Sequence, residues 1–498
     1  MEFFWQNIPF FCILLCIASA SFTSIMPKRA ARATCITVVS AVIVMSALLI
    51  SRISAFGGYY TYMMGHFPAP WGNEIRAGLL EAVSALAFSV IMLLSLLGGL
   101  RRIDEHVFED RHNLYYIMLE LLLAALLAQV YTNDLFTAYV FVEIMTLTAC
   151  SLIIARSKGR TLVAATRYMI MNLMGSGLFL LGLSFLYDLT GHLLMSNIHE
   201  QVTRITADGA LPRVLTVSAT LMSLGLAIKS ALFPFHTWLP DAYGYSTPTS
   251  SAVLSSLVSK GYIVLLIKIF YRVFGLDVIN RMRVNNVLFV FGLVGIIMGS
   301  LSAIREKDIR RMVSFSSVAQ IGYIFMGIGM GAEAGIVAAV FHIFVHGMGK
   351  SMLFLSTNGL VWVSGDSKMF RDLRGSGYRN PIAGVAFSVG SFSMVGIPFL
   401  GGFISKLYFA KAAMLMRPIE TVVVLLVLAA STILNTIYFL KTVITLYRPS
   451  ESPAPAERYK PSSGFALAMV CLVAANFALG TFSQPIIEAI RTGLRLFA

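Results

Sequence analysis

Apolar runs of about twenty residues recur along the whole 498-residue chain, and this recurrence limits the folds open to it. A helix needs about twenty residues to cross the roughly 30 Å hydrocarbon core of a bilayer. Only 12% of the residues are charged, against about 25% in soluble domains. We therefore predict an all-α polytopic membrane protein with about fourteen transmembrane helices. The predicted spans are 8–26, 34–52, 77–100, 114–132, 135–155, 163–187, 214–233, 250–273, 285–304, 312–331, 334–363, 381–410, 419–447 and 463–484.

Basic residues are concentrated in alternate loops between these spans, which explains the net charge of +14. The positive-inside rule places this set of loops in the cytoplasm and predicts that both termini of a plasma-membrane protein are extracytoplasmic. The charge is thus a marker of topology, and we expect no nucleic-acid partner. The basic loop residues are Lys28, Arg29, Arg32, Arg101, Arg102, Arg111, Arg156, Lys158, Arg160, Arg305, Lys307, Arg310, Arg311, Lys368, Arg371, Arg374, Arg379, Arg448, Arg458 and Lys460.

Charged side chains inside several spans mark candidate functional positions. A charged side chain at the centre of an inserted helix costs about 2.5–3.5 kcal/mol, so such residues are rarely there to fill the bilayer. Glu143 stands alone at the centre of the fifth span, Lys229 lies shortly before Pro234 in the seventh, and Lys260 lies in the eighth. We predict that Glu143, Lys229 and Lys260 are functional groups on a route for ions or protons.

The eleventh and twelfth spans add further titratable groups. His342, His346 and Lys350 are four residues apart, which stacks them on one helical face over about 12 Å. Three titratable groups in register favour a relay, whereas metal binding by the histidine pair is weakly supported because no third ligand is apparent. Lys406 follows the helix-breaking sequence GIPFLGG.

The remaining ionisable residues in or beside spans have simpler explanations. Glu120, less than two turns from the cytoplasmic end of the fourth span, is a candidate for facing a hydrated cavity. His236 serves either a relay or interfacial hydrogen bonding. Lys268 and Arg167 are expected to snorkel to the interface, and Glu81 to be solvated at the boundary of the third span.

Proline interrupts the seventh and twelfth spans, each time with a lysine nearby, and we expect a further break in the eighth. The seventh and twelfth are five spans apart, so they run in opposite directions across the membrane. Paired interrupted helices in inverted halves indicate a transporter's ion site. The predicted units are 1–113 with helices 1–3, 114–273 with helices 4–8, 285–447 with helices 9–13, and 448–498 with a cytoplasmic linker and helix 14.

The chain resembles the antiporter-like proton-translocating subunits shared by respiratory complex I, membrane-bound hydrogenases and multisubunit Mrp-type sodium/proton antiporters, and it looks closest to the D-type Mrp subunit and its hydrogenase-associated relatives. The resemblance covers residues from about 115 to 410 and implies that helices 4–8 and 9–13 are inverted repeats. The matching segments are VFVEIMTLTACSLI, AIKSALFPFHTWLPDAYGYSTPTSSAVLSSLVSKGY, KDIRRMVSFSSVAQIGY, FHIFVHGMGKSMLF and MVGIPFLGGFISK.

The resemblance also implies roles for individual residues. Glu143 matches the family's helix-5 glutamate, and Lys229 matches the helix-7 lysine that pairs with it. Lys260 matches the helix-8 lysine, and Lys406 the terminal lysine of helix 12. The helix-11 histidines correspond to His342 and His346.

These observations predict a proton- or sodium/proton-translocating subunit of a multisubunit membrane complex. We expect a proton to pass from the cytoplasm to Lys260, then past the two histidines, and to leave by Lys406, while Glu143 tunes Lys229. Expected partners are other membrane subunits, including related antiporter-like ones, together with protons, possible Na⁺ and the lipid bilayer. We expect no cofactor, metal or redox centre. The alternative is a quinone-binding or purely structural subunit of a membrane oxidoreductase.

Overall fold

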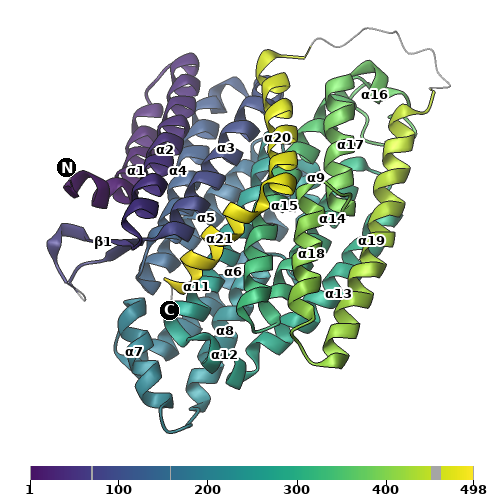
Figure 1. Cartoon of the computed structure of the whole chain (residues 1–498). Coiled ribbons are helices and arrows are strands. Elements are labelled where there is room, and N and C mark those ends of the chain that lie inside the picture. The colour runs from purple at the N-terminus through teal and green to yellow at the C-terminus, as the bar shows by residue number, and fades with distance from the viewer. Residues whose placement is uncertain (1, 69–70, 157–158, 450–460, 497–498) are drawn as a thin grey trace.

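The computed structural model describes residues 2–68, 71–156, 159–449 and 461–496, and nearly all of them are helical (Figure 1). Within these ranges, twelve helices are long and apolar enough to cross a membrane, which confirms the polytopic all-α fold. They are α1 (Glu2–Thr23), α2 (Lys28–Phe56), α3 (Leu79–His106), α4 (His112–Tyr131), α5 (Leu135–Ile154), α6 (Gly159–Thr190), the run from α10 to η5 (Pro248–Phe274), α13 (Val284–Arg305), α14 (Ile309–Gly329), α15 (Glu333–Trp362), α19 (Pro418–Tyr447) and α20 (Ser463–Thr481).

The predicted seventh and twelfth spans fall on shorter helices separated by non-helical turns. The seventh comprises α8 (Arg213–Lys229), followed by η3 (Phe235–Trp238) and α9 (Leu239–Tyr245). The twelfth comprises α17 (Pro381–Val395) and α18 (Gly401–Ala413). α17 ends at Gly396, whose φ of 96° suits glycine because it has no Cβ. Pro398 follows and has no backbone N–H with which to continue the helix.

The predicted break in the eighth span is wrong, because the helical run there has no gap. It consists of α10 (Pro248–Val253), η4 (Leu254–Val258), α11 (Ser259–Ile269) and η5 (Phe270–Phe274). η4 and η5 are π-helical turns, which widen a helix locally without ending it. The inverted relation between 114–273 and 285–447 stays a prediction.

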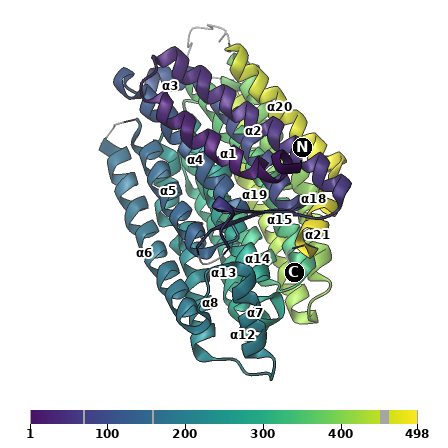
Figure 2. The ribbon, with the colours of Figure 1, turned by 90° about the vertical axis from the view of Figure 1, so that its left-hand side faces the viewer.

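The core of the bundle lies around three helical runs. The most apolar windows of Pro248–Phe274, α14 and α15 are 100%, 94% and 94% buried, against 33% for α2, α19 and α20. α15 packs on α14, α17, α18 and α20, and also on the η4 turn. Figure 2 shows α6 on one side of the bundle and α20 on the other. Lys260, Lys268 and Lys350, which these runs carry, are therefore held inside protein.

Close approach of α6 and α8 positions the end of α8. A Cβ added to Gly225 would lie 2.5 Å from the carbonyl oxygen of Gly175, and one added to Gly175 would lie 2.8 Å from the carbonyl oxygen of Gly225. Small residues at such contacts let helix backbones pack tightly in membranes. The glycine pair fixes the depth at which Lys229, one turn further along, meets α5 and α6.

The remaining elements are short and lie at the ends of the bundle or beside it. β1 and β2 form an antiparallel hairpin in which Tyr60 lies opposite Ala77. These elements are β1 (Tyr60–Met63), η1 (Met64–His66), β2 (Glu74–Ala77), η2 (Glu109–Arg111), α7 (Met195–Thr206), α12 (Leu276–Met282), α16 (Ser376–Arg379) and α21 (Ser483–Arg495).

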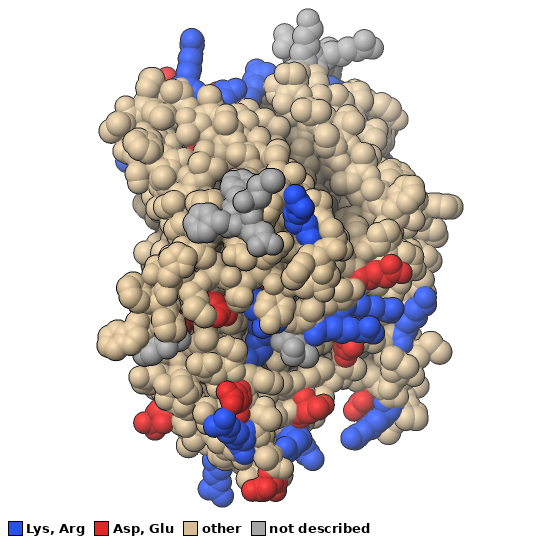
Figure 3. Space-filling view, turned by 60° about the vertical axis from the view of Figure 1, so that its left-hand side comes forward, with Lys and Arg blue, Asp and Glu red and all other residues tan. Residues whose placement is uncertain are grey.

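Polar contacts bring the predicted basic loops together at one end of the bundle, which we call the basic end. Lys28 lies 3.2 Å from Asp104, and Arg102 lies 2.7 Å from Asp366. The space-filling view has a broad upper band with few charged side chains (Figure 3). Of the predicted basic set and linker, Lys158 and residues 450–460 lie outside the described residues.

Candidate functional site

Glu143 and Lys229 form an ion pair between α5 and the last residue of α8. Their Oε1 and Nζ atoms are 3.5 Å apart. The lysine side chain is fully buried, whereas the glutamate side chain is 25% exposed. Without its carboxylate partner, a buried ammonium would carry a desolvation penalty of several kcal/mol. The pairing predicted from sequence is therefore present in the structure.

Hydroxyl groups from three helices complete this ion pair. Lys229 donates to Thr146 Oγ1 at 2.9 Å, and that hydroxyl lies 3.0 Å from the hydroxyl of Tyr262. Ser176 donates to Glu143. None of these three partners was predicted, since hydroxyl residues are common in spans. Thr146 lies one turn from Glu143 on the same face of α5, and that spacing is the signal that identifies it.

Lys260 lies about three turns beyond the start of the eighth helical run and is fully buried. Its ammonium donates to the carbonyl oxygen of Ser255, inside the π-helical turn η4, and to Ser259 Oγ at 3.1 Å. The π turn frees backbone carbonyls from regular helical pairing. Among the described residues, no carboxylate pairs with Lys260, so neutral oxygens alone contact this ammonium.

His342 and His346 lie on one face of α15, as predicted. Their rings are stacked, with centroids 5.9 Å apart and planes 10° apart. His342 Nδ1 lies 2.7 Å from Ser405 Oγ of α18. Lys260 lies within electrostatic range of both rings, and Lys406 within range of His342. His342 is therefore near both lysines, and His346 is near Lys260.

Lys350 continues the same face of α15 but turns toward α14. Its ammonium donates to the carbonyl oxygen of Val313 at 2.9 Å and to Ser316. It is fully buried, and the residues that the structure describes offer it no carboxylate. The contacts of Lys350 are thus with α14, whereas His342 contacts α18.

Lys406 contacts the C-terminal end of α17, where the predicted twelfth span is interrupted. Its Nζ donates to the carbonyl oxygen of Val395 at 2.6 Å and to Thr432 Oγ1 at 2.9 Å. Asn435 of α19 donates to the adjacent carbonyl oxygen of Met394 at 3.3 Å. Carbonyl groups at a helix C-terminus carry partial negative charge, which favours a cation there. The interruption of the helix therefore creates the lysine's binding site.

Several buried polar atoms of η4, α14 and α15 have no hydrogen-bond partner within the described ranges. They include Ser256 Oγ of η4, both ring nitrogens of His346, Nε2 of His342 and Nε2 of Gln320 on α14. Buried polar groups almost always have partners. These atoms are therefore positions at which water molecules can connect η4, α14 and α15.

His236 and Glu120 do not belong to the group formed by Lys260, Lys406 and the two histidines. His236 stacks on Phe233 with ring centroids 5.3 Å apart in the turn after α8, and it is half-buried. Glu120 is fully buried between α1 and α4, where Thr23 Oγ1 lies 3.1 Å from its Oε2. The structure brings Glu120 into contact with none of the predicted relay residues.

The expected snorkelling of Lys268 is wrong. The side chain is fully buried and points to the C-terminal end of α4. Unpaired carbonyl groups at the C-terminal end of a helix carry partial negative charge and bind an ammonium group. Lys268 therefore has acceptors nearby and does not extend to the membrane interface. The three carbonyl acceptors belong to Gln129 at 3.3 Å, Val130 at 2.8 Å and Thr132 at 2.5 Å.

The expected solvation of Glu81 is also wrong. Its side chain is 2% exposed, and its Oε1 lies 2.5 Å from Arg272 of η5. Arg272 is itself 3% exposed, so the pair joins the start of α3 to the end of the eighth helical run. The two residues are far apart in sequence and form an ion pair. The position of Glu81 within its span does not reveal this partner.

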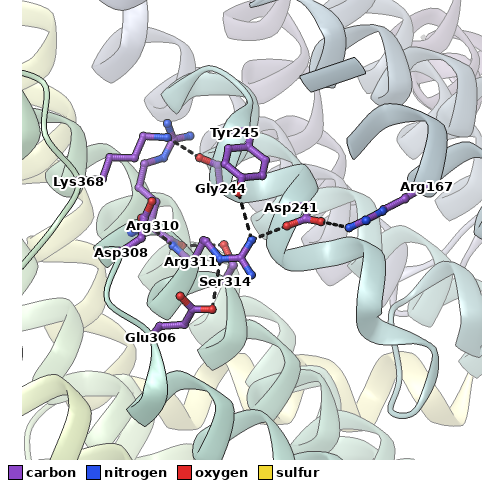
Figure 4. Close-up of polar contacts among 10 residues, drawn as sticks. All are labelled: Arg167, Asp241, Gly244, Tyr245, Glu306, Asp308, Arg310, Arg311, Ser314 and Lys368. Atoms are coloured by element: carbon purple, nitrogen blue, oxygen red, sulfur yellow. Dashed lines mark hydrogen bonds and ion pairs between the residues drawn. The ribbon is translucent and has the colours of Figure 1, made fainter. Parts of the chain in front are cut away.

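A second polar cluster lies at the basic end and joins the two predicted units (Figure 4). Asp241 of α9 lies between Arg167 of α6, at 2.5 Å, and Arg311 of α14. Arg311 also lies 3.2 Å from Glu306. We call Arg167, Asp241 and Arg311 the Asp241 clasp. Arg167 reaches the exposed surface as expected, but its guanidinium is anchored by Asp241.

Two more cations from the second unit hold the C-terminal end of α9. Arg310 donates to the carbonyl oxygens of Tyr243 at 3.1 Å and Ser246 at 2.8 Å. Lys368 donates to the carbonyl oxygen of Gly244 at 2.7 Å, as Figure 4 shows. Positively charged side chains of the second predicted unit, 285–447, therefore hold α9 and the turn that leads into α10.

Comparison with known proteins places these features in context. Residues 132–433 match the family described as NADH:quinone oxidoreductase/Mrp antiporter, transmembrane. The chain is 30% identical over 469 residues, 90% of each protein, to NADH-quinone oxidoreductase subunit N of Desulforudis audaxviator. It is 25% identical over 442 residues, 88% of this chain and 86% of the other, to the D-type subunit of the Na(+)/H(+) antiporter of Bacillus subtilis. A chain in the structure of the Mrp complex from Dietzia sp. DQ12-45-1b has a TM-score of 0.85 at 22% identity, covering 98% of this chain and 97% of that one.

Proposed function

Because the chain belongs to the NADH:quinone oxidoreductase/Mrp antiporter transmembrane family, we propose that it translocates protons, with or without exchange for Na⁺, through its own buried side chains. The observation that carries the proposal is a series of buried and partly buried titratable groups inside the bundle. It begins at the Glu143–Lys229 pair and continues through Lys260 and the stacked histidines to Lys406. We call these six residues, which include His342 and His346, the relay.

The Glu143–Lys229 pair acts as the control point of the relay. The partly exposed carboxylate stabilises the charge of the lysine, whose own side chain is fully buried. When the pair separates or the carboxylate is neutralised, the lysine loses that stabilisation and releases its proton more readily. Thr146 offers the ammonium an alternative hydrogen-bond partner at 2.9 Å during such a movement.

Proton transfer beyond Lys229 proceeds through neutral oxygens and imidazole rings. Lys260 has no carboxylate partner within the described residues, so its proton is held only by a carbonyl and a hydroxyl group. Water beside Ser256 and His346 can accept that proton. A neutral imidazole accepts a proton at one nitrogen and donates at the other, so the stacked histidines suit onward transfer toward Lys406.

We place the basic end in the cytoplasm of a cell whose plasma membrane the protein spans, with both termini on the opposite side. A cavity of ≈ 450 Å³ opens at this end beside the Asp241 clasp, lined also by Arg160 and Tyr245. This cavity supports proton uptake from the same end. The relatives belong to multisubunit membrane assemblies, so we propose that the chain works beside other membrane subunits, including related antiporter-like ones.

Replacing Lys260 by methionine tests this function. Methionine keeps much of the length and apolar surface of the lysine stem but cannot carry a proton. In everted vesicles that contain the assembled complex, the proposal expects loss of proton transport with a normal amount of complex. Normal transport in K260M would refute the relay, and loss of the complex itself would indicate a structural role.

A further inference from the structure

Among the described residues, Glu81 and Glu120 are the buried carboxylates, and Glu143 is partly buried. Glu81 pairs with Arg272 at 2.5 Å, and Glu143 pairs with Lys229 at 3.5 Å. Glu120 is fully buried, yet no lysine, arginine or histidine of the described chain forms an ion pair with it.

Hydroxyl and thiol groups of two neighbouring helices, α1 and α2, lie near Glu120. Thr23 Oγ1, at the end of α1, lies 3.1 Å and 3.4 Å from the two carboxyl oxygens. The hydroxyl of Ser19, one turn earlier, donates to the carbonyl oxygen of Cys16 at 3.0 Å and lies near the carboxyl group. The nearby thiols of Cys16 on α1 and Cys35 on α2 are buried.

These partners do not compensate a negative charge. Burying an ionised carboxylate without a cation costs far more than a hydroxyl hydrogen bond returns, so such groups are neutralised. Neutralisation requires a proton on the carboxyl group or a small metal cation beside it. Hydroxyl and carboxyl oxygens are the ligands preferred by hard cations, and thiols contribute little to binding them.

We propose that Glu120, Thr23 and Ser19 form a binding site for one small monovalent cation, H⁺ or Na⁺, separate from the relay. The site lies between α1 and α4, whereas the relay lies on α5, α8, α11, α15 and α18. α1 ends at Thr23, and the next residue, Ser24, is exposed. The site is therefore buried but close to the surface at that end of α1.

A hydrophobic carbodiimide tests the site in membranes that contain the full chain. Such reagents add to protonated carboxyl groups in apolar surroundings and not to ion-paired carboxylates. In Na⁺-free buffer we expect labelling of Glu120, located by peptide mass spectrometry, and no labelling of Glu81 as the matched buried control. The E120Q variant loses this label. T23V, which keeps the carboxyl group and removes its hydroxyl partner, remains labelled.

Adding Na⁺ distinguishes the two cations. Protection of Glu120 by Na⁺, and not by the same concentration of choline, assigns Na⁺ to the site, whereas labelling unaffected by Na⁺ assigns the proton. The proposal is overturned if Glu120 stays unlabelled from mildly acidic to mildly alkaline pH and the infrared difference between wild type and E120Q lacks a protonated carboxyl band. Labelling is independent of transport, so a failed relay and a failed Glu120 site are separate results.

Discussion

Replacing Glu143 by glutamine removes the charge nearest to Lys229 and keeps the shape of the side chain. Two unit charges 3.5 Å apart attract each other by about 5 kcal/mol at an effective dielectric constant of about 20. The glutamate side chain is 25% exposed, so solvent screening reduces this value to about 2–3 kcal/mol. That loss corresponds to a roughly 30- to 150-fold weaker hold on the proton at Lys229.

Because Lys229 is then protonated less often, the transport rate of E143Q should fall below that of the wild type, by at most this factor. Acid uptake into everted vesicles, followed with a pH-sensitive dye, measures that rate, and the amount of assembled complex is measured in the same membranes. E143D, which keeps the charge on a shorter side chain, should retain part of the activity. E200Q is the matched control, because Glu200 and Arg204 form an exposed ion pair with side chains 62% and 65% exposed. Wild-type transport in E143Q with normal assembly would refute the reasoning.

Three further substitutions test how the bundle holds its functional elements. K268M should lower the free energy of unfolding by about 1–3 kcal/mol, because it leaves carbonyl groups at the end of α4 without their donor, and thermal unfolding in detergent measures this. D241N should destabilise the protein by about 2–3 kcal/mol by leaving Arg167 and Arg311 without their shared carboxylate; thermal stability equal to wild type would contradict the clasp. G225A should cost about 1–3 kcal/mol through a clash with α6 and reduce the folded yield, whereas an unchanged yield would show that the helices can separate freely.

The fold and the central residues of the site could be predicted because charge inside an apolar run is a strong signal. The apolar sequence around Glu143, Lys229 and Lys260 offers no solvent or charged partner for them. The structure buries each of these side chains or places it in an ion pair. The i, i+4 spacing of His342 and His346 fixes their common face before any tertiary contact is known. Their roles in proton transfer stay predictions.

The partners of these residues could not be predicted, because they depend on which helices meet. Lys268 was expected at the interface, but α4 ends beside it and offers carbonyl groups instead. Glu81 was expected in solvent, yet Arg272 approaches it from a helix nearly two hundred residues away. The widened turn at η4 has no marker in its sequence, since serine and leucine occur equally in regular helices.

The central claim is that the relay forms one hydrated route through the bundle, and ordered water observed by high-resolution electron cryomicroscopy of the assembled complex tests it most directly. The account predicts water molecules that link the Lys260 ammonium, through His346 and His342, to Lys406. Dry, apolar packing between Lys260 and the histidines would contradict it.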